Sequence, residues 1–343
     1  MTTVAIAGAS GYAGAELIRL IHAHPTFTLT KITAGSLAGS RLSDVHPQFS
    51  AQSDLADLIF ADTTAQELAG ADLVFFALPH GTSGVLIAEL PDSTKVVDLG
   101  ADYRLTDAGQ WEKFYGGAYA GSFTYGLPEL PGRRAQIAAS TKVANPGCYA
   151  TAIELSLAPL VASGLVDASD TVVVAASGTS GAGRRASVNL LASEIAGSMS
   201  AYKVGGTHQH TAEIEQELNG LTASDVAVNF TPMLAPMPRG ILATISVKSA
   251  ASEAQLRTVL TDAYENEPFV HVLPVGQLPA TAATLGSNAV HLQIAKDERT
   301  SRVTIIAAID NLIKGASGQA VQNANLMFGL SEVSGLTAIG IAP

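Results

Sequence analysis

The single cysteine of the chain, Cys148, has the sequence surroundings of a reactive thiol. The segment NPGCYAT places Pro146 and Gly147 directly before it, which predicts a turn, and an apolar run typical of a helix follows. A thiol at a helix N-terminus has a lowered pKa because the helix dipole stabilises the thiolate. A lone cysteine is more often a small buried apolar residue, so its position alone does not establish a nucleophile.

Candidate proton acceptors for this thiol lie in the segment THQHTAEIEQEL, which contains His208, His210 and Glu213. On an extended segment the two histidines would point to the same side, and a Cys–His pair is the usual means of activating a thiol. Glu213 could orient either ring, so the choice between the histidines stays open. We expect no metal, because no second group of Cys, His or carboxylate residues supplies the remaining ligands.

A glycine-rich turn near the N-terminus predicts a dinucleotide site. The segment GASGYAG follows an apolar strand at residues 4–7 and opens a helical run at residues 14–24. Such a turn lets a pyrophosphate approach the backbone at the positive end of a helix. The strand before it and the helix after it favour this interpretation over a turn without a ligand. The residues expected to contact the cofactor here are Gly8, Ser10, Gly11, Tyr12 and Gly14.

The second strand indicates NADP rather than NAD. An NAD site usually has an acidic residue about 20 positions after the glycines, where it binds the ribose hydroxyls. No Asp or Glu occurs between Leu17 and Ser43, whereas TAGSLAGSR offers Ser36, Ser40 and Arg41. Hydroxyl groups and a cation suit a 2′-phosphate, so we predict that Ser36 and Arg41 contact it.

Two further loops are expected near the cofactor. FFALPHGTS ends a later apolar strand, and ligands bind at the carboxyl ends of parallel strands, so Leu78, Pro79 and His80 are predicted neighbours. SGTSGAGRR is a glycine-rich segment suited to an anionic group, and we assign its Ser180 and Gly181 to the cofactor site.

The elements that must position these residues indicate two domains. Short apolar strands alternate with helices at the start of the chain, which predicts an α/β doubly wound parallel sheet of the Rossmann type. Longer alternating strands follow Cys148 and predict a mixed or antiparallel sheet in an α+β domain for catalysis and oligomerisation. We therefore predict a cofactor domain at residues 1–147, a catalytic domain at 148–313, and a C-terminal segment at 314–343 that packs back on the cofactor domain.

The composition excludes several classes of protein. Of the 343 residues, 47% are hydrophobic and 14% charged, which suits a well-packed globular protein. The net charge of -11 argues against nucleic-acid binding, which needs a basic surface. There is no apolar run of membrane-spanning length and no signal peptide, and one cysteine forms no internal disulfide, so we expect a cytoplasmic protein without membrane partners.

Taken together, the motifs resemble the N-acetyl-gamma-glutamyl-phosphate reductase family, which is related to aspartate-semialdehyde dehydrogenase and more distantly to glyceraldehyde-3-phosphate dehydrogenase. The resemblance covers nearly the whole chain and rests on GASGYAG, ALPHGTS, VVDLGADYRL, YGLPE, NPGCYAT, SGTSGAGR, HQHTAEIEQ, FTPMLAPMPRGI and NLIKGASGQAVQNAN. It implies an NADPH-dependent reduction of an acyl phosphate through a thioester on Cys148, with phosphate released and a histidine as acid and base. It also implies a role in arginine biosynthesis and a homo-oligomer, either dimer or tetramer.

The resemblance extends to individual residues. Related enzymes carry a basic residue seven positions before the catalytic histidine, and Lys203 stands seven before His210. It implies that Arg104 meets the substrate phosphate and that Lys203 or Arg239 holds a substrate carboxylate. The other implied contacts are Asn145 with the substrate and Asn323 with the nicotinamide. Family members often have Ser-Arg after the second strand, whereas here Leu37 follows Ser36, and Arg41 is the nearest substitute.

Two alternatives remain at this stage. Aspartate-semialdehyde dehydrogenase would keep the chemistry and change the substrate, but HQHTAEIEQ and SGTSGAGR look like the acetylglutamyl type. A non-catalytic NADP-sensing protein would keep GASGYAG, but it would have no need of a cysteine at a helix start with two histidines available.

Overall fold

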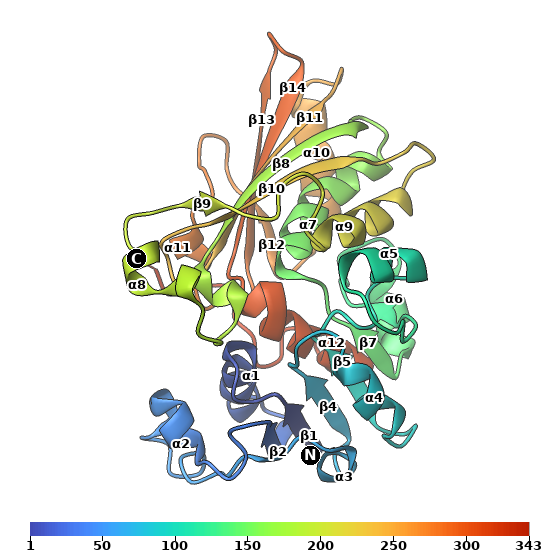
Figure 1. The fold of residues 1–343 in the computed structure, drawn as a ribbon. Coiled ribbons are helices and arrows are strands. Elements are labelled where there is room, and N and C mark those ends of the chain that lie inside the picture. The colour runs from blue at the N-terminus through green and yellow to red at the C-terminus, as the bar shows by residue number, and fades with distance from the viewer. Residues whose placement is uncertain (343) are drawn as a thin grey trace. The chain divides into compact units, whose positions relative to one another are not determined.

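Two separate sheets organise the computed structural model, which describes residues 1–342 (Figure 1). Unit 1 consists of residues 1–146 and 316–336, and unit 2 consists of residues 147–315 and the described residues from 337 on. The predicted C-terminal segment 314–343 therefore divides, whereas the sequence assigned all of it to the cofactor domain. Its last part belongs to unit 2 because Asn288 N donates to Thr337 O and Ile341 N donates to Leu285 O.

The sheet of unit 1 is entirely parallel, with strand order β3-β2-β1-β4-β5-β7-β6. This confirms the predicted doubly wound sheet, and the order reverses direction between β1 and β4, where such sheets bind ligands. The strands are β1 (Thr2–Ala7), β2 (Phe27–Ala34), β3 (Ala61–Asp62), β4 (Leu73–Phe76), β5 (Lys95–Asp98), β6 (Thr124–Tyr125) and β7 (Lys142–Ala144).

The helices of unit 1 alternate with its strands along the chain. The first of them buries Leu17, Ile18 and Ile21 along one side, and it starts two residues earlier than the sequence predicted. The helices are α1 (Tyr12–His22), α2 (Leu42–Val45), α3 (Ala65–Leu68), α4 (Ser83–Ala88), α5 (Ala108–Phe114), α6 (Arg133–Ala139) and α12 (Gly318–Met327), with a 3-10 turn at Pro47–Phe49.

The sheet of unit 2 is mixed, as predicted, with order β12-β13-β14-β11-β8-β10-β9. The pairs β8–β10 and β12–β13 are parallel, and the other pairs are antiparallel. The strands are β8 (Asp167–Ser177), β9 (Ser200–Ala201), β10 (Val228–Leu234), β11 (Ile241–Lys248), β12 (Val270–Val272), β13 (Val290–Asp297) and β14 (Arg302–Ile309). The helices are α7 (Cys148–Ala162), α8 (Ala192–Ile195), α9 (His210–Asn219), α10 (Glu253–Tyr264) and α11 (Thr281–Thr284), with 3-10 turns at Thr179–Ala182 and Val188–Leu190.

Helix α7 is buried on nearly every side and begins at the cysteine. It packs against α9, α10 and the sheet, and Tyr264 Oη donates to Leu155 O at 2.6 Å. The sheet face toward the helices is closed to solvent. On it, Ile245 pairs with Val173 and with Ile305 on the neighbouring strands, and all three side chains are 0% exposed. The nucleophile candidate therefore stands at the start of a rigid, buried element.

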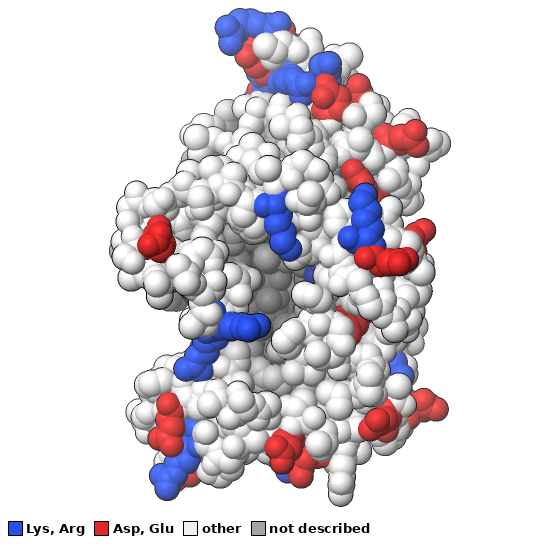
Figure 2. Space-filling model, viewed as in Figure 1, with Lys and Arg blue, Asp and Glu red and all other residues white. Residues whose placement is uncertain are grey.

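Charged side chains are sparse on one face of the molecule. On the face drawn in Figure 2, small groups of basic and acidic residues are scattered among uncharged ones, and no broad basic patch is visible. Over residues 1–342, no helix combines the length and the apolar character that a membrane crossing requires.

Candidate active site

The turn before Cys148 is held by a buried carboxylate. Gly147 is the N-cap residue of α7, and its N–H donates to Glu213 Oε1 at 2.7 Å. The side chain of Glu213 is almost fully buried on α9. The sequence left open which histidine Glu213 would orient, and the structure shows its carboxylate bonded to the turn that carries the cysteine.

His210 packs against the same turn. A Cβ atom added at Gly147 would lie 2.4 Å from His210 Nε2, so the ring occupies the space that any larger residue at position 147 would fill. His210 is the first residue of α9 and is buried. Its ring therefore lies beside the residue that precedes Cys148, as a partner of the thiol requires.

His208 has a different environment. Its Nδ1 accepts the main-chain N–H of His210 at 3.1 Å, and its ring packs edge-on against the aromatic rings of Tyr149, Tyr202 and Phe230. Burial, with a smaller contribution from the neighbouring His210 and Lys203, lowers the pKa of His208 to about 2. His208 thus stays neutral and supports the start of α9.

The predicted extended segment around the two histidines is wrong. Residues 207–209 form a turn that leads directly into α9, and Thr211 N donates to His208 O at 3.0 Å. The two imidazole rings nevertheless lie 4.8 Å apart, because the side chain of His208 folds back onto the helix start.

Gly147→Ala is expected to lower kcat by roughly 10- to 100-fold, because an added Cβ displaces the His210 ring and misplaced catalytic groups lose rate steeply. Gly147 has φ -70° and ψ 148°, which alanine adopts without strain, so the effect is steric. Steady-state kinetics measure it. Gly70→Ala is the matched control, since nothing lies within 4 Å of its added Cβ. Equal kcat for Gly147→Ala and the control would contradict this contact.

The other side of the cysteine is closed by a glycine. A Cβ at Gly315 would lie 2.7 Å from the Cβ of Cys148 and 3.4 Å from Ile309 Cδ1. Gly315 lies in a π-helical turn (Ile313–Ser317), a local departure that is frequent at functional sites. Cys148 therefore has a glycine on two sides: Gly147 precedes it in the chain, and Gly315 packs against its Cβ atom.

The glycine-rich turn of unit 1 has the geometry of a dinucleotide site. Gly8 has φ +79°, and a Cβ there would lie 2.4 Å from Ala77 O. A Cβ at Gly14 would lie 2.5 Å from Ala9 Cα, so this glycine allows close packing of α1. At Gly11 the nearest atom would be 3.6 Å away, which leaves the backbone accessible. These are the three distinct roles that glycines have in a dinucleotide fingerprint, so the residues fit a nicotinamide dinucleotide.

The residues predicted for the 2′-phosphate lie on one loop after β2. Ser36 and Arg41 are exposed, and Arg41 Nη1 lies 3.3 Å from Asp57 Oδ1. Both side chains of that pair are well exposed to solvent, so the interaction is weak. The loop after β4 carries Leu78, Pro79 and His80, and the imidazole of His80 packs edge-on against Tyr115.

Two aspartates that the sequence did not assign shape the loop after β4. Asp102 accepts from Gly81 N at 2.8 Å and from Gly84 N at 3.2 Å. Asp98 at the end of β5 accepts from Ser83 Oγ at 3.0 Å, and burial raises its pKa to about 7. Both residues stand in VVDLGADYRL, where Asp98 ends a buried strand and Asp102 follows four residues later. Acidic residues at the carboxyl end of a buried strand are a signal that could have identified them.

Arg104, Asn145 and Asn323 form a network within unit 1. Arg104 donates from Nε to Asn145 O and from Nη2 to Leu99 O, both at 2.8 Å. Asn323 Nδ2 donates to Gly126 O at 2.8 Å and to Asn145 Oδ1 at 3.0 Å. All three side chains are buried, and these bonds hold the segment that leads to Cys148. The predicted contacts of these residues with substrate and nicotinamide stay predictions.

The remaining predicted residues lie in unit 2. Lys203 has φ 44°, a rare conformation for a residue other than glycine, and its Nζ donates to Gln209 Oε1 at 2.7 Å. Ser180 and Gly181 lie in the 3-10 turn after β8, and Ser180 Oγ accepts from Asn311 Nδ2 at 3.0 Å. Arg239 forms an ion pair with the buried Asp310.

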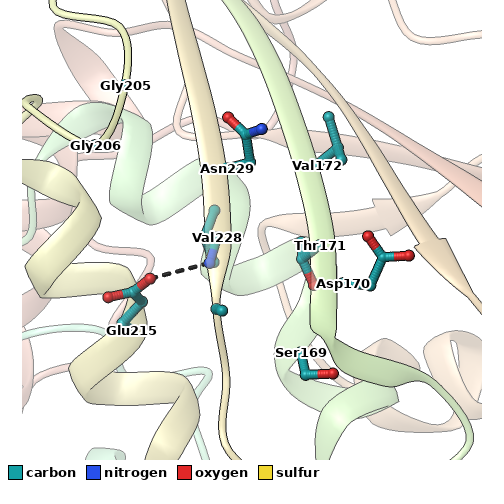
Figure 3. Close-up of a pocket in the computed structure, with 10 residues that line it drawn as sticks. Ser169, Asp170, Thr171, Val172, Gly205, Gly206, Glu215, Val228 and Asn229 are labelled. Carbon is teal, nitrogen blue, oxygen red and sulfur yellow. Dashed lines mark hydrogen bonds between the residues drawn. The ribbon is translucent and has the colours of Figure 1, made fainter.

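A cavity elsewhere in unit 2 contains none of the predicted residues. It lies where β8 and β10 begin, beside the loop at Gly205 and Gly206 (Figure 3). Glu215 Oε1 accepts from Val228 N there at 3.0 Å and so covers part of the edge of β10. Cys148 and its neighbours lie toward the other end of these strands, where Tyr149 Oη donates to Met233 O, so the cavity is separate from the candidate site.

Comparisons with known proteins identify the family. Residues 3–139 match the model of the semialdehyde dehydrogenase NAD binding domain, and residues 148–311 match that of the semialdehyde dehydrogenase dimerisation domain. The chain belongs to the semialdehyde dehydrogenase family. Its similar relatives include the N-acetyl-gamma-glutamyl-phosphate reductases of Acidothermus cellulolyticus, 58% identical over 342 residues, and of Thermobifida fusca, 52% identical over 343 residues. In both cases 99% of each chain is covered.

Solved structures of the family share the fold. Aspartate semialdehyde dehydrogenase II of Vibrio cholerae has a TM-score of 0.71 with 17% identity over 96% of this chain and 98% of that one. The enzyme of Candida albicans, crystallised with NADP, has a TM-score of 0.70 with 17% identity and the same coverage. At this level of identity the similarity confirms the predicted two-domain fold of the semialdehyde dehydrogenases and nothing finer.

Proposed function

We propose that this protein reduces N-acetyl-gamma-glutamyl phosphate to N-acetylglutamate 5-semialdehyde with NADPH and releases phosphate, a step of arginine biosynthesis. The observation that carries the proposal is the arrangement of the side chains and backbone around Cys148. The thiol begins a buried helix, Glu213 fixes the N–H before it, and His210 packs on Gly147. The names of relatives at 52–58% identity over the full chain support this choice of substrate.

The Cys148 thiolate attacks the acyl carbon, the bond to the phosphate oxygen breaks, and a thioester remains on Cys148. His210 takes the thiol proton before the attack, which leaves a stronger nucleophile. When bound, NADPH supplies the hydride that reduces the thioester carbonyl. His210 returns its proton to the resulting oxyanion, and base removal of that proton later expels Cys148 as thiolate and frees the aldehyde.

The substrate's charged groups meet basic side chains in this scheme. Arg239 or Lys203 binds the carboxylate, and Arg104 and Asn145 bind the phosphate end. The glycine turn of unit 1 would hold the pyrophosphate of the cofactor, and Ser36 and Arg41 would hold its 2′-phosphate. Ser180, Gly181 and Asn323 would contact its nicotinamide part. The accessible backbone at Gly11 supports the contact between the glycine turn and the pyrophosphate.

The protein acts as a homo-oligomer in this proposal. Its family model for residues 148–311 is described as a dimerisation domain. Val174, Thr244 and Ile306 form a register row on the sheet face opposite the helices, and Val174 is 40% exposed. A sheet face that leaves apolar side chains such as Val174 open to solvent is a suitable surface for a second copy.

The alternative substrate is aspartate semialdehyde, since the structural relatives act on it according to their names. In the phosphate-dependent reverse direction, we expect kcat/KM for N-acetylglutamate 5-semialdehyde to exceed that for aspartate semialdehyde by more than about 100-fold, because a buried site leaves its polar groups unpaired with the wrong substrate. Reduction of the dinucleotide, followed with NADP and NAD in parallel, measures this and the cofactor choice. Faster use of aspartate semialdehyde would contradict the assignment, and no turnover of either aldehyde would favour a non-catalytic NADP-sensing protein.

A further inference from the structure

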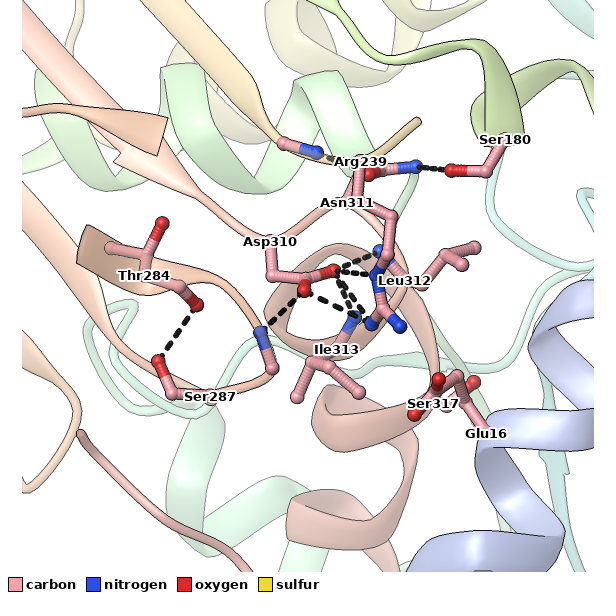
Figure 4. Close-up of polar contacts among 12 residues, drawn as sticks. Glu16, Ser180, Arg239, Thr284, Ser287, Asp310, Asn311, Leu312, Ile313 and Ser317 are labelled. Carbon is pink, nitrogen blue, oxygen red and sulfur yellow. Dashed lines mark hydrogen bonds and ion pairs between the residues drawn. The ribbon is translucent and has the colours of Figure 1, made fainter. Parts of the chain in front are cut away.

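The buried carboxylate of Asp310 forms an ion pair whose function the reaction scheme does not yet explain. Asp310 follows β14 directly and is 0% exposed. Its Oδ1 accepts from Arg239 Nε at 3.3 Å and from Arg239 Nη2 at 3.0 Å, and Nη2 lies 3.0 Å from Oδ2 (Figure 4). The carboxylate thus engages one edge of the guanidinium plane, which fixes the plane as well as the position of the charge.

Asp310 is the rigid partner of this pair. Its carboxylate also accepts three main-chain N–H groups, from Gly286 at 2.7 Å, Leu312 at 2.8 Å and Ile313 at 3.2 Å. These donors hold Asp310 independently of the arginine, whose side chain is 21% exposed. The backbone at Arg239 is confined as well, because a Cβ at Gly178 would lie 2.7 Å from Arg239 N.

The pair lies at the end of the sheet that carries the cysteine. Ile241 pairs with both Ser177 and Ile309 at this end of the sheet. Arg239 stands two residues before Ile241, and Asp310 directly follows Ile309. The π-helical turn that continues from Asp310 brings Gly315 against Cys148. Asn311 adds a second link, since its Oδ1 accepts from Gly240 N at 2.7 Å.

We propose that Asp310 is the positioning residue of the carboxylate subsite: it holds the Arg239 guanidinium in the orientation that binds the α-carboxylate of the acyl substrate. The proposal rests on the proposed function and assigns the carboxylate to Arg239 rather than to Lys203. A salt bridge that served only stability could lie anywhere in the sheet. This one adjoins the turn that carries Gly315, which packs against the nucleophile Cys148. A guanidinium fixed in advance loses little conformational entropy on binding, so the subsite discriminates strongly for a carboxylate.

The test compares two aldehydes in the phosphate-dependent reverse direction: N-acetylglutamate 5-semialdehyde and 4-acetamidobutanal, which lacks the α-carboxylate. For Asp310→Asn we expect KM for the first aldehyde to rise roughly 10- to 100-fold with little change in kcat, while kcat/KM for the second stays within about threefold. In an Arg239→Met background, Asp310→Asn should cause no further loss of selectivity, because the two residues act as one unit.

The control is Asp170→Asn, which removes another Asp–Arg contact, with Arg302 Nη2 at 2.6 Å, from the far end of the same sheet. It should leave the selectivity unchanged. Equal losses for both aldehydes, or a further loss in the Arg239→Met background, would overturn the proposal. If Asp310→Asn does not fold, Asp310→Glu displaces the pair and retains the charge, and unchanged selectivity would then refute it. A wild-type enzyme without preference for the carboxylated aldehyde would instead refute the proposed substrate.

Discussion

Replacement of Cys148 by serine is expected to lower kcat by about 10³-fold or more, because a serine hydroxyl is a far weaker nucleophile without a strong base and leaves poorly from the reduced intermediate. The substitution changes one atom at the start of α7, so the thermal unfolding midpoint should stay close to that of the wild type. Steady-state reduction of the acyl phosphate with NADPH measures kcat.

A second measurement separates covalent catalysis from simple positioning. Wild-type protein mixed with acyl phosphate in the absence of NADPH should gain the mass of one acyl group on the peptide that contains Cys148, and the serine variant should not. Ser156→Ala on the same buried helix is the control, since its hydroxyl donates only to Ala152 O. Unchanged turnover in Cys148→Ser would exclude the thioester mechanism.

His210→Asn is expected to lower kcat by about 10²- to 10⁴-fold, which is the usual contribution of a general acid–base residue. His208→Asn should lower it less than about tenfold, because asparagine supplies an oxygen near the place of Nδ1 and can still accept the N–H of His210. The two variants carry the same substitution two residues apart and therefore control for each other. Comparable losses in both would contradict the assignment of the base to His210.

The pH dependence gives an independent check of the same assignment. The lowered pKa of His208, about 2, keeps it neutral throughout the working range, so its titration contributes nothing to the rate profile there. A base that must be unprotonated makes kcat/KM fall as the pH drops through its pKa. His208→Asn should leave that acidic limb in place, and His210→Asn should remove it.

Sequence periodicity predicted the elements whose side chains alternate regularly. The strands Ile241–Lys248 and Arg302–Ile309 are among the longer alternating strands that were predicted after Cys148, because their side chains alternate between the buried face and the open face of the sheet. The short strand Lys142–Ala144 has too few residues for any period, and its pairing with β5 makes it a strand. Strand pairing of this kind is set by the fold and leaves no local signal.

The candidate site could be predicted from the sequence where a reactive residue and the turn that positions it are neighbours in the chain. Cys148 was recognised because the turn and the helix adjoin it in the chain. The relation between His208 and His210 was not, since it depends on how a side chain folds back on a helix start. Asp310 carried no signal at all, because its arginine lies 71 positions away in the chain and its charge alone looks like that of any surface aspartate.

The burial of helix α7 on nearly every side links the reactivity of the thiol to the folding of the newly made chain. A helix of 15 residues that depends on burial on nearly every side has little stability alone in water, so we expect α7 to form as the sheet of unit 2 assembles around it. Until then Cys148 does not begin a helix, and His210 does not pack against the turn that precedes it. We therefore expect the chain during synthesis to carry an ordinary cysteine, whose thiolate fraction at neutral pH is small. The rate of thiol alkylation during refolding would report directly when the catalytic unit closes.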